Sequence, residues 1–418
     1  MKMINTIDLF AGCGGLMDGF EQSGKYRTLA CVEWEKAPCQ NLAKRLKDKW
    51  KYEDADELVL RFDIQRTDEL FHGWNDPEYG TSVGLDSLVQ KGGNVDLIIG
   101  GPPCQAYSIA GRVRDENGMR NDYRNYLFES YIKVVKQYKP KAFVFENVPG
   151  LLSAQPGGFP IIDVIQKTFD DAGYVVLTNL KRAVLDFTEF GIPQNRSRII
   201  ILGLSKEAYG SEATALLDKF YDTILPAFKC QKKKTVRDAI GDLPALYPLM
   251  FETKIGAKKC SHSFMESSIP NHFPRWHSKR DIEIFRKLAY DIESGERKYV
   301  STEALKQLYE AETGHKSNVH KYYVLRWNEP SNLIPAHLYK DGLRHIHPSS
   351  AQARSITVRE AARLQTFPDD YEFIGSQMEQ YKMIGNAVPP AFSKILATAV
   401  YKLLFENGGA ESAVLQKS

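Results

Sequence analysis

The sequence has few of the features that mark a secreted, metal-binding or membrane-spanning protein. It contains no run of about 18 apolar residues, the length that a membrane-spanning helix needs, and its first residues show no signal-peptide pattern. Its six cysteines are scattered and form no CxxC pair, which argues against a structural zinc site. We therefore expect a cytosolic protein with reduced thiols and no bound metal. The cysteines are Cys13, Cys31, Cys39, Cys104, Cys230 and Cys260.

The sequence also lacks a strong net charge, which is only +3 over 418 residues. The charge is unevenly distributed, however. Residues 228–350 contain 21 lysines and arginines against 14 acidic residues, and eight of the nine histidines. A basic segment in an otherwise slightly acidic chain is typical of a surface that binds a polyanion. A solvated basic surface without a partner is the alternative, and charge alone does not separate the two.

Short apolar runs separated by helix-like stretches occupy the first 205 residues. Strands that are apolar throughout and alternate with helices indicate a parallel sheet covered by helices on both faces. The fold class predicted is therefore α/β, with a doubly wound, mostly parallel sheet. The predicted strands are Ile4–Phe10, Leu29–Glu33, Leu58–Phe62, Val95–Gly100, Ala142–Glu146 and Arg198–Gly203, and the clearest helices are Arg124–Tyr138 and Pro160–Ala172.

The regular alternation stops after about residue 203. Residues 206–375 are predicted to form a second, smaller and irregular domain, while 1–205 and 376–418 form the first. Helical patterns return near the C-terminus at Thr357–Leu364 and Ala391–Leu404. In the former, Thr357 is the expected N-cap, and Glu360 completes a capping box.

A glycine-rich turn follows the first predicted strand. Glycines let the backbone approach a ligand closely, as in nucleotide-binding turns. Glu33, at the end of the second strand, is positioned to accept both hydroxyls of a ribose. The adjacent Trp34 is predicted either to stack on a purine or to pack in the core, and Asp63–Ile64 to contact the adenine edge. The turn comprises Phe10, Ala11, Gly12, Cys13, Gly14, Gly15 and Leu16.

A cysteine behind two prolines follows the strand that ends at Gly100. Most isolated cysteines are inert, but Cys104 has chemically relevant neighbours. Glu146 ends the next strand, and Arg196 and Arg198 lead into another. The carboxyl ends of parallel strands share one edge of a sheet, which is where such folds bind their ligands. A thiol, a carboxyl and two guanidinium groups are therefore predicted to meet there.

The chain resembles the DNA cytosine-C5 methyltransferase family, of the restriction-modification type, over nearly its whole length. The PPCQ and ENV motifs together, in this order, are highly specific. The matching segments are FAGCGG (10–15), Glu33-Trp34, PPCQAYS (102–108), ENVPG (146–150), QNRSR (194–198), TVREAARLQTFP (357–368) and IGNAVPP (384–390).

The resemblance implies a covalent mechanism of methyl transfer to cytosine. Cys104 would add to C6 of the base, which makes C5 nucleophilic. Glu146 would hold N3 and the exocyclic amine and supply a proton toward N3. Arg198 would contact O2, and Arg196 would fix the catalytic loop. The sequence does not identify the base that removes the C5 proton.

The resemblance also implies S-adenosyl-L-methionine as methyl donor. Phe10 and Trp34 would flank the adenine, Glu33 would hold the ribose, and the glycine turn would hold the methionine part. Asn386 and Val388 would close over the donor, which requires the end of the chain to return to the first domain. The full set of implied cofactor-binding residues is Phe10, Ala11, Gly12, Cys13, Gly14, Gly15, Leu16, Glu33, Trp34, Asp63, Ile64, Pro102, Leu127, Asn386 and Val388.

Double-stranded DNA is the implied partner, and its target base must be flipped out of the helix. The basic segment Ser108–Asn125 is predicted to close over the DNA, the alternative being a passive surface loop. Residues 228–350 correspond to the family's target recognition region. The stretches 271–277 and 337–347 are expected mainly to support folding or contact phosphates, and base-edge contact is the alternative. Ala110 stands where some relatives carry a gap-filling polar residue.

Three rival functions remain open to test. The tRNA-methylating branch of the family shares the catalytic motifs, but its Cys-Phe-Thr signature is absent here. A catalytically inactive DNA-binding regulator would be expected to lack the cysteine or the carboxylate. A nicotinamide-dependent dehydrogenase would explain the glycine turn but not the PPCQ and ENV motifs. We expect a monomer, with a cognate restriction endonuclease as a further candidate partner.

Overall fold

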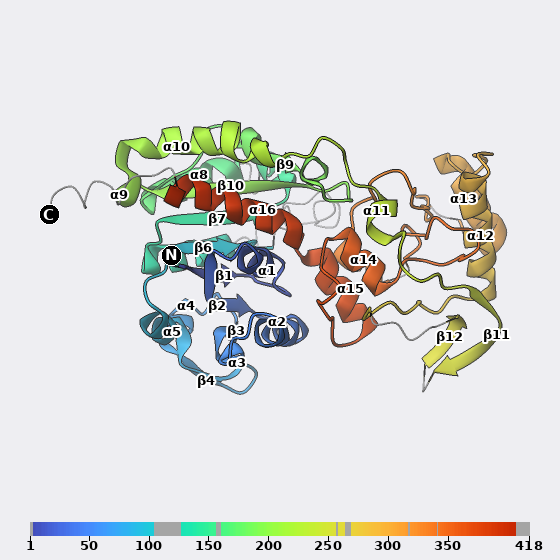
Figure 1. Cartoon of the computed structure of the whole chain (residues 1–418), viewed down its shortest axis with the longest axis horizontal. Helices are drawn as coiled ribbons and strands as arrows, with labels where there is room; N and C mark the ends of the chain where they lie inside the picture. The colour runs from blue at the N-terminus through green and yellow to red at the C-terminus, as the bar shows by residue number, and fades with distance from the viewer. Residues whose placement is uncertain are drawn as a thin grey trace. The chain divides into compact units, whose positions relative to one another are not determined.

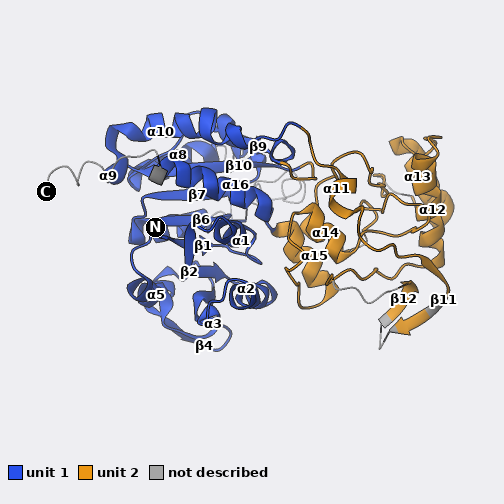
Figure 2. Cartoon of the chain, in the orientation of Figure 1, with its two compact units in different colours: residues 1–190, 196–231, 387–418 blue, residues 191–195, 232–386 orange. Residues whose placement is uncertain are grey.

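The chain forms two compact units in a computed structural model, shown in Figures 1 and 2. Unit 1 comprises residues 1–190, 196–231 and 387–418, and unit 2 comprises residues 191–195 and 232–386. Cys104, Ala110 and the basic segment Ser108–Asn125, predicted to close over the DNA, lie outside the described residues. The structure describes residues 3–103, 127–155, 160–255, 258–263, 269–316, 318–340 and 342–406.

Unit 1 is built on a sheet with the strand order β3-β2-β1-β6-β7-β10-β8, in which β9 also pairs with β10. The strands β3, β2, β1, β6 and β7 run parallel to one another. The predicted α/β fold with a mostly parallel sheet is therefore confirmed. The strands are β1 (Ile4–Leu9), β2 (Tyr26–Glu33), β3 (Val59–Arg61), β6 (Leu97–Gly100), β7 (Ala142–Asn147), β8 (Tyr174–Val175), β9 (Val184–Asp186) and β10 (Ser197–Ser205), with a separate hairpin of β4 (Trp74–Asp76) and β5 (Gly80–Ser82).

Helices flank this sheet, and Figure 1 shows β2 and β3 between α2 on one side and α5 on the other. The helices of unit 1 are α1 (Gly15–Gln22), α2 (Lys36–Asp48), α3 (Ala55–Leu58), α4 (Thr67–His72), α5 (Gly84–Gly92), α7 (Leu127–Tyr138), α8 (Ile161–Asp171), α9 (Lys206–Tyr209), α10 (Ala213–Lys219) and α16 (Pro390–Tyr401). Short 3-10 or π turns join them at η2 (Pro149–Ser153), η4 (Leu180–Ala183), η5 (Phe187–Phe190), η6 (Gly210–Glu212), η7 (Phe220–Ile224), η8 (Pro226–Phe228) and η10 (Lys402–Glu406).

The core of unit 1 is apolar and rich in aromatic rings. Every residue of β1, β6 and β7 is buried, which fits strands covered on both faces. Phe143 packs at 4.4 Å from Phe169 of α8, and Tyr131 of α7 packs edge-on against Phe145. The Tyr131 hydroxyl donates to the carbonyl of Val144 at 2.9 Å. These contacts fix the strands whose ends carry the predicted site.

The C-terminal helix α16 packs against α1. A Cβ atom on Gly19 of α1 would lie 2.3 Å from the Cβ of Ser393 and 2.5 Å from the Pro390 carbonyl oxygen. The ring of Phe392 stacks on Phe187 with centroids 3.8 Å apart. The end of the chain thus returns to the unit in which it begins.

The unit boundaries differ from the predicted domain boundaries at 205/206 and 375/376. Residues 206–231 belong to unit 1, because buried Ala213 and Leu217 of α10 and the Tyr221 hydroxyl, which donates to Ile200 of β10, tie them to the sheet. Residues 376–386 belong to unit 2, because the Tyr381 hydroxyl donates to the carbonyl of Ile356 there. Sequence periodicity gave no sign of either attachment.

Unit 2 has a small core and many connecting loops. Helices α12 and α13 enclose an apolar cluster that includes Phe285, Leu288 and Leu308. The predicted capping box of α14 is present: Thr357 accepts from the Glu360 backbone and the Glu360 carboxylate accepts from the Thr357 backbone. The elements are α11 (Val236–Ile240), β11 (Pro248–Ile255), β12 (Lys258–His262), α12 (Lys279–Glu293), α13 (Thr302–Thr313), η9 (Ala336–Tyr339), α14 (Val358–Leu364) and α15 (Gln377–Asn386).

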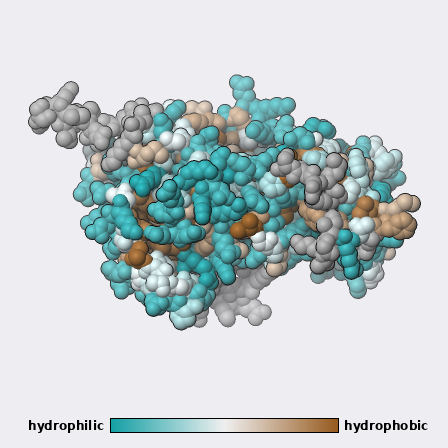
Figure 3. Space-filling view, turned by 60° about the horizontal axis from the view of Figure 1, so that its bottom comes forward, coloured by the Kyte–Doolittle hydropathy of each residue, from teal (hydrophilic) through white to brown (hydrophobic). Residues whose placement is uncertain are grey.

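The outside of the protein is mostly hydrophilic on the face shown in Figure 3, where hydrophobic residues form small, separate spots. Within the described residues, no helix combines the length and the apolar character needed to cross a membrane.

Candidate active site

The ends of four neighbouring strands bring most of the predicted site residues to one edge of the sheet. Strands β1, β2, β6 and β7 are parallel, so their carboxyl ends lie on the same side. The glycine turn follows β1, Glu33 ends β2, Gly101 follows β6, and Glu146 is the penultimate residue of β7. Cys104, predicted to be the nucleophile, lies outside the described residues.

The glycine turn after β1 has a backbone that favours glycine. Gly12 and Gly14 have φ values of +55° and +84°, and Phe10, which is not a glycine, has φ +59°. A Cβ atom on Gly12 would meet nothing within 4 Å, so the turn borders open space there. At Gly15, by contrast, a Cβ atom would lie 2.3 Å from the carbonyl oxygen of Val388. The turn is therefore open on one side and held by the C-terminal segment on the other.

Glu33 is held by backbone amides. Its carboxylate accepts from the N–H groups of Gly12 at 2.9 Å, Trp34 at 2.9 Å and Glu35 at 2.8 Å. Burial raises the pKa of Glu33, and the backbone hydrogen bonds from Glu35 and Gly12 oppose that rise. The carboxyl group thus has a fixed orientation at the end of β2, next to the glycine turn.

Trp34 and the segment after β3 complete this side of the edge. Trp34 is 51% exposed, so the alternative that it packs in the core is wrong. Its indole ring is accessible to a ligand. Asp63 accepts from the backbone N–H of Gln65 at 3.0 Å, and Ile64 is buried. Among the other predicted cofactor residues, Ala11, Cys13, Leu16, Pro102, Leu127 and Val388 are buried in unit 1, whereas Asn386 is exposed at the end of α15 in unit 2.

Glu146 and Arg198 form an ion pair on adjacent strands. Arg198 Nε lies 2.8 Å from Glu146 Oε1, and the two side chains are only 13% and 12% exposed. The other carboxylate oxygen faces Gly101, where a Cβ atom would lie 2.7 Å away. Because Gly101 has no side chain, it leaves the space that the Glu146 carboxylate occupies. This role was not assigned from the sequence, although Gly101 directly precedes the PPCQ motif.

Asn147 connects the end of β7 to the segment before Cys104. Its side-chain amide donates to the carbonyl of Pro102 at 3.3 Å and accepts from the backbone N–H of Val148 at 2.8 Å. This is a second contribution that sequence reasoning did not assign, although Asn147 stands within the ENV motif. It joins the proline loop and the strand end that bears Glu146.

Arg196 is buried in unit 1 with few partners. Its Nη2 donates to the carbonyl of Ala387 at 3.0 Å, while Nε and Nη1 have no hydrogen-bond partner within the described part of the chain. Burial and the charge of Arg198 lower the pKa of Arg196 well below its usual range, and Glu146 opposes this. Ala387 thus contacts Arg196, and both Ala387 and Val388 lie against Gly15 at the start of α1.

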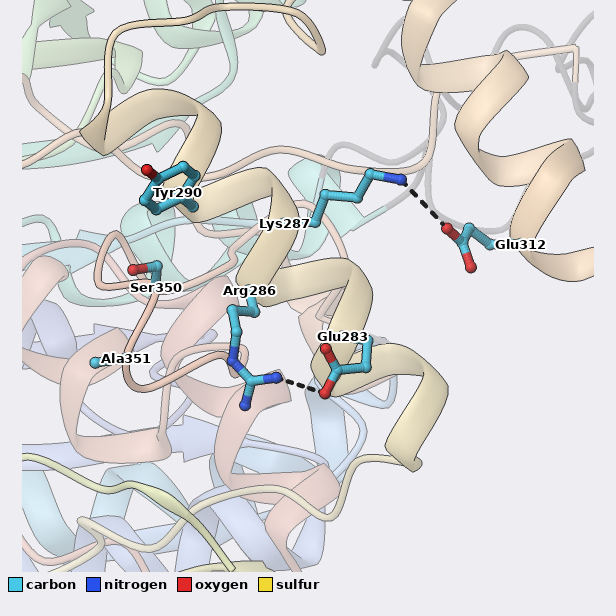
Figure 4. A pocket seen from close by; sticks show the side chains of 7 residues that line it. All are labelled: Glu283, Arg286, Lys287, Tyr290, Glu312, Ser350 and Ala351. Carbon is cyan, nitrogen blue, oxygen red and sulfur yellow. Dashed lines mark hydrogen bonds and ion pairs between the residues drawn. The ribbon is translucent and has the colours of Figure 1, made fainter.

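Other parts of the described chain offer weaker candidates. No cluster of histidine, cysteine and acidic side chains with metal-binding geometry occurs within the described residues. A surface pocket in unit 2 is lined by charged side chains that already pair with each other, as Arg286 does with Glu283 and Lys287 with Glu312 (Figure 4). It contains none of the predicted site residues.

The histidines of unit 2 mostly serve its interior. His345 Nε2 donates to the carbonyl of Leu333 at 3.1 Å, and His277 Nε2 lies 3.2 Å from the Ser355 hydroxyl. Burial lowers the pKa of both imidazoles. The imidazoles of His277 and His345 therefore help to hold the interior of unit 2 together.

The chain is similar to known DNA methyltransferases over most of its length. The chain is 35% identical to the type II methyltransferase M.Bpa9945I of Bacillus paralicheniformis, covering 94% of this chain and 98% of that protein. It is 32% identical to the type II methyltransferase M1.HphI of Haemophilus parahaemolyticus, covering 96% and 87%. A solved structure described as a DNA modification methyltransferase encoded within an E. coli prophage has the same fold, with a TM-score of 0.59 at 22% identity and coverage of 96% and 99%.

The sequence profile described as C-5 cytosine-specific DNA methylase matches residues 4–74 and 81–402, which is nearly the whole chain. The protein therefore belongs to the C-5 cytosine-specific DNA methylases and is a DNA cytosine-C5 methyltransferase.

Proposed function

We propose that this protein methylates C5 of a flipped-out cytosine in a short duplex DNA site, with Cys104 as covalent nucleophile and S-adenosyl-L-methionine as donor. The observation that carries the proposal is the Glu146–Arg198 ion pair beside Gly101 and Pro102. In the sequence, Cys104 follows Pro102 by two residues. A carboxyl and a guanidinium group beside the cysteine-bearing segment can hold N3 and O2 of a pyrimidine.

The residues around the glycine turn suit the donor. Glu33 is positioned to accept from ribose hydroxyls, and the exposed indole of Trp34 offers a face for adenine. The open space at Gly12 gives room for the methionine part. When bound, S-adenosyl-L-methionine supplies an electrophilic methyl group. The donor would be held by Phe10, Ala11, Gly12, Cys13, Gly14, Gly15, Leu16, Glu33, Trp34, Asp63, Ile64, Pro102, Leu127, Asn386 and Val388.

The proposed chemistry uses three side chains on the base. The Cys104 thiolate forms a bond to C6, and the electron pair of the C5–C6 double bond makes C5 nucleophilic. Glu146 supplies a proton toward N3, where negative charge develops. Arg198 stabilises O2 and orients the Glu146 carboxylate. Once C5 carries the methyl group, loss of the C5 proton restores the double bond, breaks the bond between C6 and sulfur and releases the Cys104 thiolate, while N3 gives its proton back.

Arg196 has a positioning role in this proposal. Its guanidinium is buried and bonded to Ala387, so it links the site to the C-terminal segment that also contacts Gly15. Two of its nitrogens remain available to the segment that carries Cys104. This supports the implied role of fixing the catalytic loop.

The biological setting follows from the relatives. Several are named type II methyltransferases, a class that accompanies restriction endonucleases. We propose that this protein protects host DNA in such a system and acts as a monomer on its site. The cognate endonuclease would recognise the same short duplex sequence.

The test is methyl transfer by purified protein to duplex DNA and to tRNA. We expect transfer to DNA only, at a site that bisulfite sequencing of the expressing host identifies. The Cys104→Ser variant should lose methylation while it still binds the duplex. Activity on tRNA alone would contradict the DNA assignment, and normal turnover by Cys104→Ser would exclude the covalent route.

A further inference from the structure

The hairpin of β11 and β12 in unit 2 contains a large bulge. Pro248 pairs with His262 and Thr253 pairs with Cys260, and the register shifts between these points. Four residues of β11 therefore stand opposite the single residue Ser261 of β12. A bulge bends its strand and redirects its side chains out of the regular ladder.

The strand opposite the bulge is firmly anchored in unit 2. Cys260, Ser261 and His262 are all buried. The Ser261 hydroxyl accepts from the backbone N–H of His277 at 3.0 Å, and the His262 ring lies 3.0 Å from the carbonyl of Gln352. The bulge thus projects from a fixed base.

Two large apolar side chains occupy the bulge and face solvent. Met250 is 87% exposed and Phe251 is 76% exposed, more than any other large hydrophobic side chain in the described residues. Isolated exposed apolar residues are ordinary, but two adjacent ones on a redirected strand favour a contact surface. Trp276, which is also exposed, has its ring next to Lys259 of β12 and adds an apolar group beside the hairpin.

The net positive charge around the bulge indicates which kind of partner it could bind. Residues 248–262 contain three lysines and one glutamate. Lys254 and Lys259 are exposed, and the Lys259 ammonium lies 5.6 Å from the centre of the Trp276 ring. A second copy of this hairpin would repel it, whereas a polyanion with apolar faces would complement it. Duplex DNA combines phosphates with stacked bases, and its major groove admits a two-stranded β-ribbon.

We propose that Met250 and Phe251 form an apolar wedge that contacts bases of the duplex substrate, with Lys254 and Lys259 on its phosphates. Methionine and phenylalanine side chains can insert between base steps and unstack them, which also lowers the cost of removing one base from the stack. This inference rests on the proposed function, since it assigns a role in substrate binding to one element of unit 2.

Salt dependence of binding separates an apolar contact from a phosphate contact. The dissociation constant is measured by fluorescence anisotropy over a range of salt concentrations, on a duplex carrying the site mapped in the wild-type host and on a scrambled duplex. Met250→Ala/Phe251→Ala should weaken binding about tenfold or more at every salt concentration, with an unchanged salt slope. Lys254→Gln/Lys259→Gln should instead reduce the slope by about 2.

The matched control is Tyr290→Ala/Val300→Ala, which removes two exposed apolar side chains elsewhere in unit 2 and should bind like wild type. Because Met250 and Phe251 face solvent, their removal should leave the circular dichroism melt unchanged. An affinity equal to that of the control, or an altered salt slope in Met250→Ala/Phe251→Ala, would overturn the wedge. The wedge would also be overturned if Met250→Ala/Phe251→Ala sedimented differently from wild type in the absence of DNA, because Met250 and Phe251 would then contact a second copy of the protein. Wild-type methyl transfer, scored separately, tests the proposed function.

Discussion

The two units bury different kinds of side chain. The sheet strands of unit 1 are apolar, and two of the carboxyl groups that it buries, Asp8 and Glu33, lie near the carboxyl ends of β1 and β2. Unit 2 buries Arg354 and Arg359 almost completely, together with five histidines: His262, His272, His277, His345 and His347. Unit 1 also has a buried ion pair, between Arg45 and Asp18.

The difference follows from the amount of regular structure. A sheet covered by helices satisfies its backbone internally, so apolar side chains can fill the space between its layers. Unit 2 has long connecting loops whose carbonyl and N–H groups need other partners. Arg359 donates to the carbonyls of Pro270 and Tyr371, and Arg354 donates to the Glu360 carboxylate. In unit 2, charged and imidazole side chains therefore form hydrogen bonds to backbone groups that secondary structure would satisfy in unit 1.

The largest expected effect of this difference is an opposite response to pH. Burial lowers the pKa of His262 and His345 to about 4 and of His347 to about 3, from 6.5. The unfolded chain binds these protons first, so unit 2 loses stability as pH falls below about 6.5, by about 2 kcal/mol per histidine at about pH 5. In unit 1, burial raises the pKa of Asp8 and Glu33, so protonation at low pH favours its folded state.

Hydrogen exchange at about pH 7 and about pH 5, corrected for intrinsic rates, tests this contrast peptide by peptide. Protection should fall in α12 and α14 before it falls in β1 and β7. The single histidine of unit 1, His72, is exposed and provides an internal control. Equal loss of protection in both units would contradict the assignment of acid sensitivity to the buried imidazoles.

The second prediction breaks the polar core of unit 2 directly. Arg354 donates to both oxygens of Glu360 at 2.7 Å, and both side chains are buried. Arg354→Met should cost about 3–5 kcal/mol of unfolding free energy, because it leaves a buried charge without its partner. Urea denaturation measures the loss. Arg354→Met/Glu360→Gln should recover much of it, since glutamine can still cap the Thr357 backbone. A double variant as unstable as the single would rule out the unpaired charge as the cause.

The third prediction concerns the site edge of unit 1. Gly101→Ala would place a Cβ atom 2.7 Å from the Glu146 carboxylate and displace it from Arg198. The single-turnover rate constant should fall about 100-fold, while thermal stability changes little, because the displaced atoms end a flexible side chain. Gly92→Ala is the matched control, since its Cβ atom meets only the end of the Leu29 side chain at 2.4 Å. A normal rate in Gly101→Ala would show that the rate of methyl transfer does not depend on the position of the Glu146 carboxylate.

Much of unit 1 was predictable, because its strands are short apolar runs that end in marked residues. The edge that gathers Glu33, Gly101 and Glu146 follows from the parallel order of those strands. The antiparallel direction of β10 between β7 and β8 was not predictable, because a fully buried apolar run has no directional pattern. For the same reason the sequence placed Glu146 and Arg198 on one edge but did not show that they pair.

The interior of unit 2 was much less predictable. The capping box of Thr357 and Glu360 joins residues three positions apart, so the sequence predicted it correctly. The contacts of Arg359 with Pro270 and of His277 with Ser355 span long separations and follow no period. Basic and histidine-rich segments are typical of a solvated or DNA-binding surface, so composition alone suggested exposure for side chains that are buried.

The last and smallest prediction tests whether the apolar core of unit 1 is insensitive to charge. Gly19→Ala would bring a Cβ atom within 2.7 Å of the Lys394 backbone nitrogen and closer still to Ser393 and Pro390, forcing α1 and α16 apart. Overpacking of this kind costs about 1–3 kcal/mol. Since the three atoms nearest to the new methyl group are uncharged atoms of Ser393, Pro390 and the Lys394 backbone, the cost should be the same at about pH 7 and about pH 5, and hydrogen exchange should rise in α1 and α16. Gly385→Ala, which meets the Pro335 backbone at 2.3 Å, is the counterpart in unit 2 and should raise exchange in α15 instead. A pH-dependent cost at Gly19 would show that charge governs the core of unit 1 as well, and the contrast between the units would then fail.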